Sequence, residues 1–175
     1  MTDEGKEGIE SLEKGTIISR DKKALDIMGY SREELATVIK QLHDQGLNRY
    51  EQGEKVENNH YLEWVSPNGK KYHAMLLYNM GHVDCPWSCK EDRNNYNSSL
   101  YLFVYDYDWR DRRNKDPVAD INGLLIHTIQ NHGYFGGAKT TISPKMARVS
   151  PEEIVDLFLP ERKSGSIEQA KKLQF

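Results

Sequence analysis

Residues 15–47 read GTIISRDKKALDIMGYSREELATVIKQLHDQGL, and this stretch decides what kind of fold the sequence predicts. It begins with Thr16–Ile18, a β-branched run that favours a short strand. A short helix is predicted over residues 22–28, where Gly29 supplies the usual C-terminal stop. The stretch therefore predicts a strand that enters a helix, followed by a glycine break.

The second helix of this stretch carries a clear N-terminal signature. Ser31 and Glu34 have the Ser-x-x-Glu spacing of a capping box, in which each side chain satisfies a backbone N–H of the other. Gly46 is the predicted stop. An apolar stripe at helical spacing runs between them, formed by Leu35, Val38, Ile39 and Leu42.

The next segment along the chain has the pattern of a β-hairpin. Alternating residues predict strands over 61–65 and 71–80, and Ser66–Gly69 (SPNG) supplies an Asn-Gly turn between them. The strongest strand pattern is Leu100–Asp108, which alternates over nine residues. We expect these strands to form an antiparallel sheet.

The C-terminal third predicts two more helices. Asp116-Pro117 favours a helix start, with a stop near Gly133, and Ser150 begins a capping box for a last short helix. These elements predict an α+β fold, an antiparallel sheet with helices packed on it. We expect residues 1–14 to be a mobile N-terminus, residues 15–160 a single domain, and residues 161–175 a mobile C-terminal tail.

Composition narrows the function classes. The chain has 175 residues and a net charge of -3, so it lacks the overall basic character of most nucleic-acid binders. No apolar run approaches membrane-spanning length, and the N-terminus has no apolar signal region, so we expect a cytoplasmic protein without a membrane partner. Two cysteines are too few for a disulfide framework.

Three segments together resemble PAS sensory domains. GTIISRDKKALDIMGYSREEL resembles the segment in which a PAS strand enters a helix, LEWVSPNGKKYHAMLLYN the central hairpin, and LYLFVYDYDWRDRR the last strand. The resemblance covers residues 15–110. It implies a sensor with a small apolar cavity, or a domain that docks on another protein.

ALDIMGYSREELATVIKQLHDQGL also resembles the two-helix core of winged helix-turn-helix domains, with the hairpin as the wing. This alternative implies that the second helix reads DNA with its exposed polar side chains. The candidates are Arg32, Thr37, Lys40 and Gln41. Acidic residues near the start of that helix and the net charge weigh against DNA binding.

The loop after the hairpin contains candidate metal ligands. His82, Cys85 and Cys89 offer imidazole and thiolate groups, which are the ligands of tetrahedral zinc. A fourth ligand would come from His73, His127 or His132. The five-residue offset between His127 and His132 is not the i, i+4 ligand pair, so capping or surface roles are the alternative for them. Ordinary reduced thiols are the alternative for the cysteines.

Asp106 and Asp108 end the strongest predicted strand. Residues two apart on a strand share a face, so both carboxylates could hold a divalent metal for phosphoryl or nucleotidyl transfer. No second motif accompanies the pair. The leading hypothesis is therefore a non-enzymatic regulatory module that binds a small molecule or a protein partner. The alternatives are a winged-helix DNA binder and a metal-dependent transferase.

Overall fold

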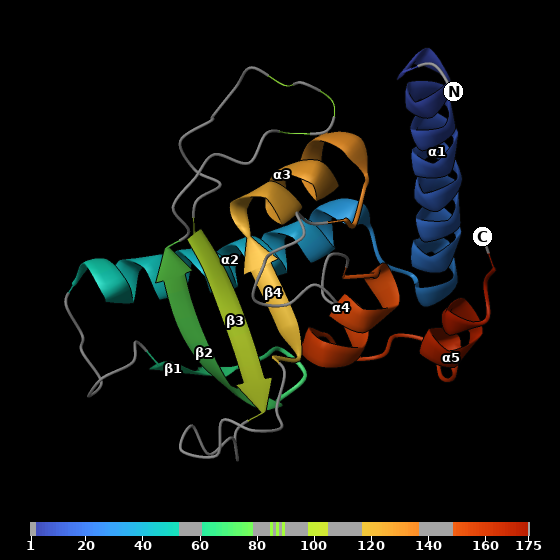
Figure 1. Cartoon of the computed structure of the whole chain (residues 1–175). Coiled ribbons are helices and arrows are strands. Elements are labelled where there is room, and N and C mark those ends of the chain that lie inside the picture. The colour runs from blue at the N-terminus through green and yellow to red at the C-terminus, as the bar shows by residue number, and fades with distance from the viewer. Residues whose placement is uncertain are drawn as a thin grey trace.

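A computed structural model describes residues 3–52, 61–78, 85, 87, 89, 98–104, 117–136 and 149–174. In the described part of the chain, two helices come first, four strands follow, and three helices come last (Figure 1). In chain order they are α1 (Asp3–Met28), α2 (Arg32–Glu51), β1 (Tyr61–Val65), β2 (Lys71–Tyr78), β3 (Ser98–Val104), β4 (Ala119–Asn122), α3 (Gly123–His132), α4 (Pro151–Phe158) and α5 (Ser166–Lys171).

The strands form one sheet in the order β1-β2-β3-β4, and each strand pairs antiparallel with the next. Ala74 of β2 lies opposite Leu62 of β1 and Leu102 of β3, which fixes the register of the central strands. Gly69 has a φ of 82° in the β1–β2 turn, where the Ser66 N–H donates to the Lys70 carbonyl at 2.9 Å. The predicted α+β class and the predicted hairpin are confirmed.

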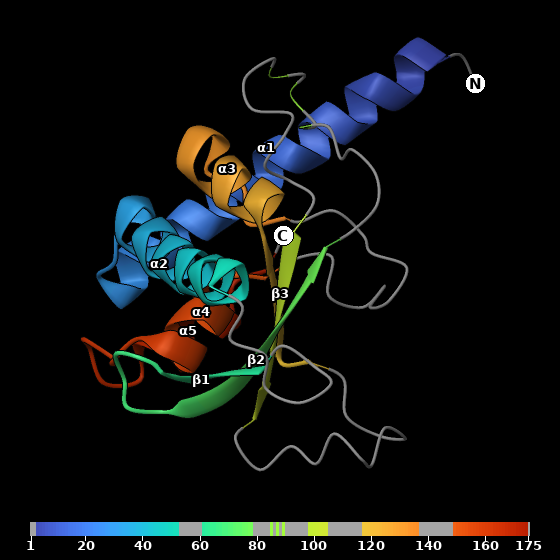
Figure 2. The ribbon, with the colours of Figure 1, turned by 90° about the vertical axis from the view of Figure 1, so that its left-hand side faces the viewer.

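Helices α2, α3 and α4 gather on the same side of the sheet (Figure 2). Of these, α2 contacts β2, β4, α3 and α4, so it forms the centre of the helical layer. Helix α1 packs against α4 and α5, and its N-terminal half extends away from the rest of the described fold (Figures 1 and 2).

The core lies between the sheet and the helices. The apolar stripe predicted on α2 faces it, with Leu35, Ile39 and Leu42 fully buried. The predicted capping box is also present, since Ser31 Oγ accepts from the Glu34 N–H at 3.2 Å and Glu34 accepts from the Ser31 N–H at 2.8 Å. Other large, fully buried side chains are Met28, Ile121, Leu125, Ile129, Phe135 and Phe158.

Two local predictions in the opening stretch are wrong. Thr16–Ile18 is not a strand but part of α1, which runs without a break to Met28. Gly46 does not end α2, which continues to Glu51. Gly46 is buried and is not among the described glycines that have a positive φ, so it lacks the backbone conformation of a helix stop.

The helix predicted from Pro117 starts later. Residues 119–122 form β4 at the edge of the sheet, and all four are buried. Helix α3 begins only after Asn122, whose side chain accepts from the Leu125 N–H at 2.8 Å. Its predicted end is confirmed, because Gly133 has a φ of 66° and its N–H bonds back to Ile129.

Both chain ends contain helix where the sequence predicted mobile segments. α1 begins at Asp3, inside the expected N-terminal segment of residues 1–14. α5 lies inside the expected tail of residues 161–175, and its Ala170 is fully buried in the core. The described fold therefore extends past residue 160.

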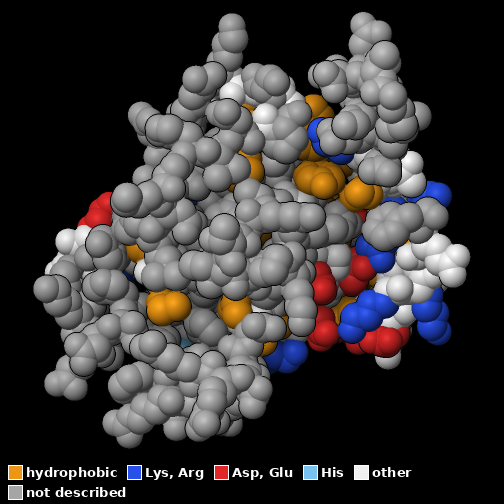
Figure 3. Space-filling model, viewed as in Figure 1, with side chains coloured by type: hydrophobic (Ala, Val, Ile, Leu, Met, Phe, Trp, Pro, Cys, Tyr) orange, Lys and Arg blue, Asp and Glu red, His pale blue; other side chains and the backbone are white. Residues whose placement is uncertain are grey.

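The described surface near the C-terminus is charged with both signs. Over α4 and α5, acidic and basic side chains lie next to one another (Figure 3). Lys171 pairs with Asp156 at 3.3 Å and with Glu168 at 3.1 Å, which accounts for part of this pattern. Among the helices of the described residues, none is both long enough and apolar enough to cross a lipid bilayer.

Candidate metal centre

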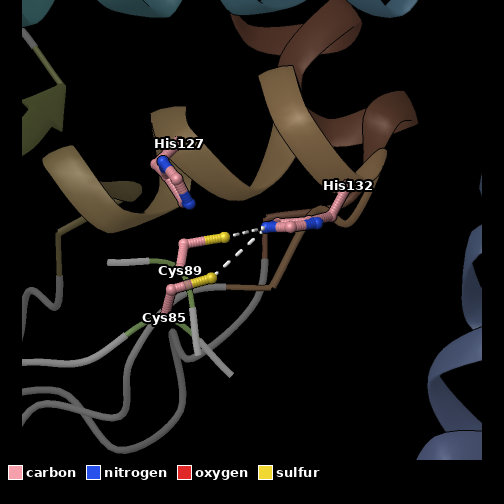
Figure 4. Close-up of side chains that lie close together, drawn as sticks. All are labelled: Cys85, Cys89, His127 and His132. Atoms are coloured by element: carbon pink, nitrogen blue, oxygen red, sulfur yellow. Dashed lines mark hydrogen bonds between the residues drawn. The ribbon is translucent and has the colours of Figure 1, made fainter. Parts of the chain in front are cut away.

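Helix α3 carries two of the candidate ligands, His127 and His132. Its apolar side, which includes Leu125 and Ile129, is buried and holds the helix against the core. Residues five apart on an α-helix point about 140° apart around its axis. His132 is the last helical residue, however, and its ring turns toward the same space as His127, with the ring centroids 5.4 Å apart (Figure 4).

The two cysteines approach α3 from the loop after β2. Cys85 Sγ and Cys89 Sγ each lie 3.3 Å from His132 Nε2 (Figure 4). Cys85 is buried, Cys89 is half-buried, and both are free thiols. One ligand atom from each of Cys85, Cys89, His127 and His132 lies within 4.8 Å of all the others.

This geometry is close to that of a tetrahedral zinc site. Zn–S and Zn–N bonds of about 2.3 and 2.0 Å place sulfur and nitrogen about 3.5 Å apart along an edge of the tetrahedron. The two measured S···N distances of 3.3 Å are close to that edge. The remaining pairs, at up to 4.8 Å, need a shift of about 1 Å to complete the tetrahedron.

Aromatic and apolar groups enclose one side of the cluster. The Trp87 ring stacks on the His132 ring with centroids 4.3 Å apart and planes 10° apart, and it meets Tyr134 edge-on at 5.3 Å. Lys14 of α1 places its Nζ over the Trp87 ring, 5.3 Å from the centroid. Leu124, 2% exposed, packs with Cys85, Cys89 and Trp87 beneath the loop.

Burial of His132 and its closeness to His127 favour the neutral imidazole, which is the form that binds a metal. Desolvation by burial lowers the pKa of His132, and the neighbouring His127 lowers it further. The neutral imidazole, with a free lone pair, is therefore the main form of His132 at neutral pH. Asn131 Nδ2 lies 3.0 Å from His127 Nδ1 and so restrains the second ring.

The structure revises the predicted ligand set. Cys85 and Cys89 are in the cluster as predicted, and His127 and His132 both join them, although only one was expected to. His73 is elsewhere, on β2, with its Nε2 3.7 Å from Glu63 Oε1. His82, Asp106 and Asp108 lie outside the described residues.

A signal for the histidine pair was present in the sequence. Tetrahedral zinc sites typically combine Cys-x2–4-Cys with His-x3–5-His. Cys85-x3-Cys89 and His127-x4-His132 both fall within these ranges. The interpretation of the histidines as capping or surface residues rested on the i, i+4 spacing alone.

The candidate DNA-contacting residues of α2 lie along its outer side. Thr37, Lys40 and Gln41 are exposed, and Arg32 is partly exposed. The two cations have acidic partners on the same helix, since Arg32 pairs with Glu33 and Lys40 with Asp44. Nothing in this arrangement tests DNA binding, which stays a prediction.

A cavity of about 350 Å³ adjoins the cluster. It lies between α1, the start of α2 and the end of α3, and His132 forms part of its wall. Apolar side chains line one part of it and charges of both signs line another. The apolar side chains are Ile18, Leu25 and Tyr30. The charged side chains are Lys22, Asp26, Arg32 and Glu33.

No protein-family model, curated protein or solved structure matches this chain.

Proposed function

We propose that this protein is a non-enzymatic regulatory module whose fold is completed by a structural zinc ion bound to Cys85, Cys89, His127 and His132. The observation that carries the proposal is the convergence of four ligand atoms within 4.8 Å. Two of them come from one loop and two from one helix, about 40 positions later in the sequence.

The donor set favours zinc over other common divalent ions. Magnesium and calcium prefer oxygen ligands, whereas two thiolates and two imidazoles suit zinc. Four protein ligands also complete the tetrahedron, which is typical of structural sites. A catalytic zinc keeps one position for water or substrate, so the ligand count favours a structural role over an enzymatic one.

Zinc at this position would attach the loop to α3. It would add to the contacts of Trp87 with His132, Tyr134 and Lys14 and to the packing on Leu124. Because a metal that binds only the folded state adds its binding free energy to stability, zinc would raise the melting temperature.

The cavity beside His132 favours small-molecule binding as the regulatory activity. Its volume of about 350 Å³ is within the range of ligand pockets. Small-molecule binding is also the activity that the PAS resemblance implies, and a ligand in this cavity would lie next to the proposed zinc. A macromolecular partner is the alternative for the same module.

Zinc content is the decisive measurement. We expect protein purified with a reductant to contain one zinc per chain by native mass spectrometry and elemental analysis. Cys85→Ser and His132→Ala should each lower zinc affinity at least a hundredfold, because three ligands remain. His73→Ala is the matched control, since it removes a histidine outside the cluster, and it should keep full zinc content.

Cobalt substitution provides a second readout that does not depend on stability. Co²⁺ in a tetrahedral site with two thiolates gives intense visible bands and a thiolate-to-metal charge-transfer band. Wild-type protein that binds neither zinc nor cobalt would overturn the proposal. Binding that persists unchanged in both Cys85→Ser and His132→Ala would also overturn it.

A further inference from the structure

We propose that Cys85 and Cys89 are a peroxide-oxidised pair, and that their conversion to a disulfide releases the zinc and detaches the loop from α3. This inference rests on the proposed zinc site and adds a means of regulating it. The substrate class is a hydroperoxide, with hydrogen peroxide as the simplest member.

The two sulfurs are already close enough to bond after a small movement. Both lie 3.3 Å from the same atom, His132 Nε2, and they are within 4.8 Å of each other. A disulfide needs a separation of about 2.05 Å, so the gap to close is below about 3 Å. Cys85, Trp87 and Cys89 belong to neither a helix nor a strand, so no regular hydrogen-bonded element at these positions opposes that movement.

The different burial of the two sulfurs assigns their order of reaction. Cys89 is half-buried, whereas Cys85 is only 5% exposed. Peroxide from solvent therefore reaches Cys89 first, and Cys85 is the resolving thiolate behind it. Zinc keeps both sulfurs deprotonated, and the thiolate is the form that peroxide oxidises.

The reaction balances without any other cofactor. Cys89 Sγ attacks one peroxide oxygen, the O–O bond breaks, and hydroxide leaves while Cys89 becomes a sulfenic acid. Cys85 Sγ then attacks Cys89 Sγ, the S–S bond forms, and a second hydroxide leaves. Two thiolates lose two electrons, peroxide gains them, and two protons from solvent complete two waters. The disulfide sulfurs are poor ligands, so Zn²⁺ departs.

The loss of zinc would change the surface of α3. Leu124 packs with Cys85, Cys89 and Trp87. When the loop detaches, this leucine loses these apolar neighbours, and the Trp87 ring separates from His132 and Lys14. The oxidised state would thus present an apolar contact that the reduced state hides.

The test uses the full-length zinc-loaded protein under argon. Zinc content is measured first, and hydrogen peroxide is then added in steps while a chromogenic chelator reports free zinc. We expect one zinc released per disulfide, a loss of two hydrogens per chain in the intact mass, and full recovery after dithiothreitol and zinc are added. Trp87 fluorescence should change in parallel, as judged against Trp87→Phe.

Chelation without peroxide separates oxidation from simple metal loss. Zinc removed from the reduced protein by a strong chelator should leave the intact mass of the chain unchanged, whereas peroxide should release zinc together with the loss of two hydrogens. A wild-type protein that contains zinc but keeps it in peroxide would overturn this inference and leave the zinc site standing. Release by oxidation to sulfinic acid without a disulfide would also overturn it. Protein that never binds zinc would overturn both proposals.

Discussion

Arg20 of α1 and Glu152 of α4 form a buried two-point ion pair across 132 positions of sequence. Arg20 donates through both terminal nitrogens to the two carboxylate oxygens, with Nη1 2.7 Å from Oε2. Arg20 also donates to Asp21 and to the Ala170 carbonyl of α5, each at 3.3 Å. The hydrogen bond that Arg20 donates to Glu152 is the main reason that the pKa of Arg20 is raised, so the guanidinium stays charged in the core.

Glu152→Gln should be strongly destabilising. The substitution keeps the shape of the side chain but removes the carboxylate charge that faces the buried guanidinium of Arg20. Removing one partner of a buried pair costs about 3 kcal/mol or more, which urea unfolding can measure. Glu168→Gln removes an exposed partner of Lys171 and should change stability by less than about 1 kcal/mol. Equal changes in the free energy of unfolding for the two variants would show that the buried pair contributes no more to stability than the exposed one.

The packing of α5 against α1 and α4 gives a second prediction. Ala170 is fully buried, so Ala170→Asp places a charge in the core where α5 meets α1, and we expect a loss of about 3 kcal/mol. Lys172→Asp introduces the same residue two positions later on an exposed surface and should cost less than about 1 kcal/mol. If residues 161–175 are the mobile tail that the sequence suggested, neither substitution will change the unfolding free energy.

The sequence predicted α2 and the hairpin well because their signals are local. The Ser31–Glu34 capping box and the Asn68-Gly69 turn depend on residues a few positions apart, and both appear in the structure. The part of α1 before residue 22 was missed for the opposite reason. Its buried face includes Arg20 and Asp21, and charged residues look like a solvent-exposed surface in a hydrophobic pattern. The partner that makes their burial favourable, Glu152, is distant in sequence.

The sequence-based predictions for the edge strand β4 and for the histidine pair were also wrong. All four β4 residues are buried, so the period-two alternation that identifies a half-exposed strand is absent. The preceding Pro117 favoured a helix start and shifted the boundary by several residues. His127 and His132 converge because α3 ends at His132, and the i, i+4 rule for a continuous helix does not describe a residue at the helix terminus.

The raised pKa of Tyr72 predicts that the folded state loses stability at high pH. Burial, with a smaller contribution from Asp156, raises the pKa of Tyr72 to about 12, and its hydroxyl donates to the Leu157 carbonyl at 2.6 Å. Because the folded-state pKa is above the unfolded value of about 10, the neutral phenol contributes stability below pH 10. That contribution is lost as the pH rises from about 10 toward 12.

Tyr72→Phe provides the test of this pH dependence. The variant should lose about 1 kcal/mol at pH 7 with the hydrogen bond, and its stability should fall less steeply above pH 10 than that of the wild type. Urea midpoints at several pH values measure both effects. Identical slopes above pH 10 in the two proteins would contradict the assignment.

Trp87 should tune how tightly the cluster holds zinc. Its ring covers one face of His132 at 4.3 Å and keeps water from that side of the ligand. An aromatic stack contributes about 0.5–1.5 kcal/mol, so Trp87→Ala should weaken zinc binding about three- to tenfold in a competition titration with a chromophoric chelator.

Trp87→Phe keeps a stacking ring, so its zinc affinity should lie closer to that of the wild type. If alanine and phenylalanine weaken binding equally, the indole acts through its contacts with Tyr134 or Lys14 and not through the histidine stack. A zinc affinity unchanged in both variants would show that the four ligands alone set the strength of the site.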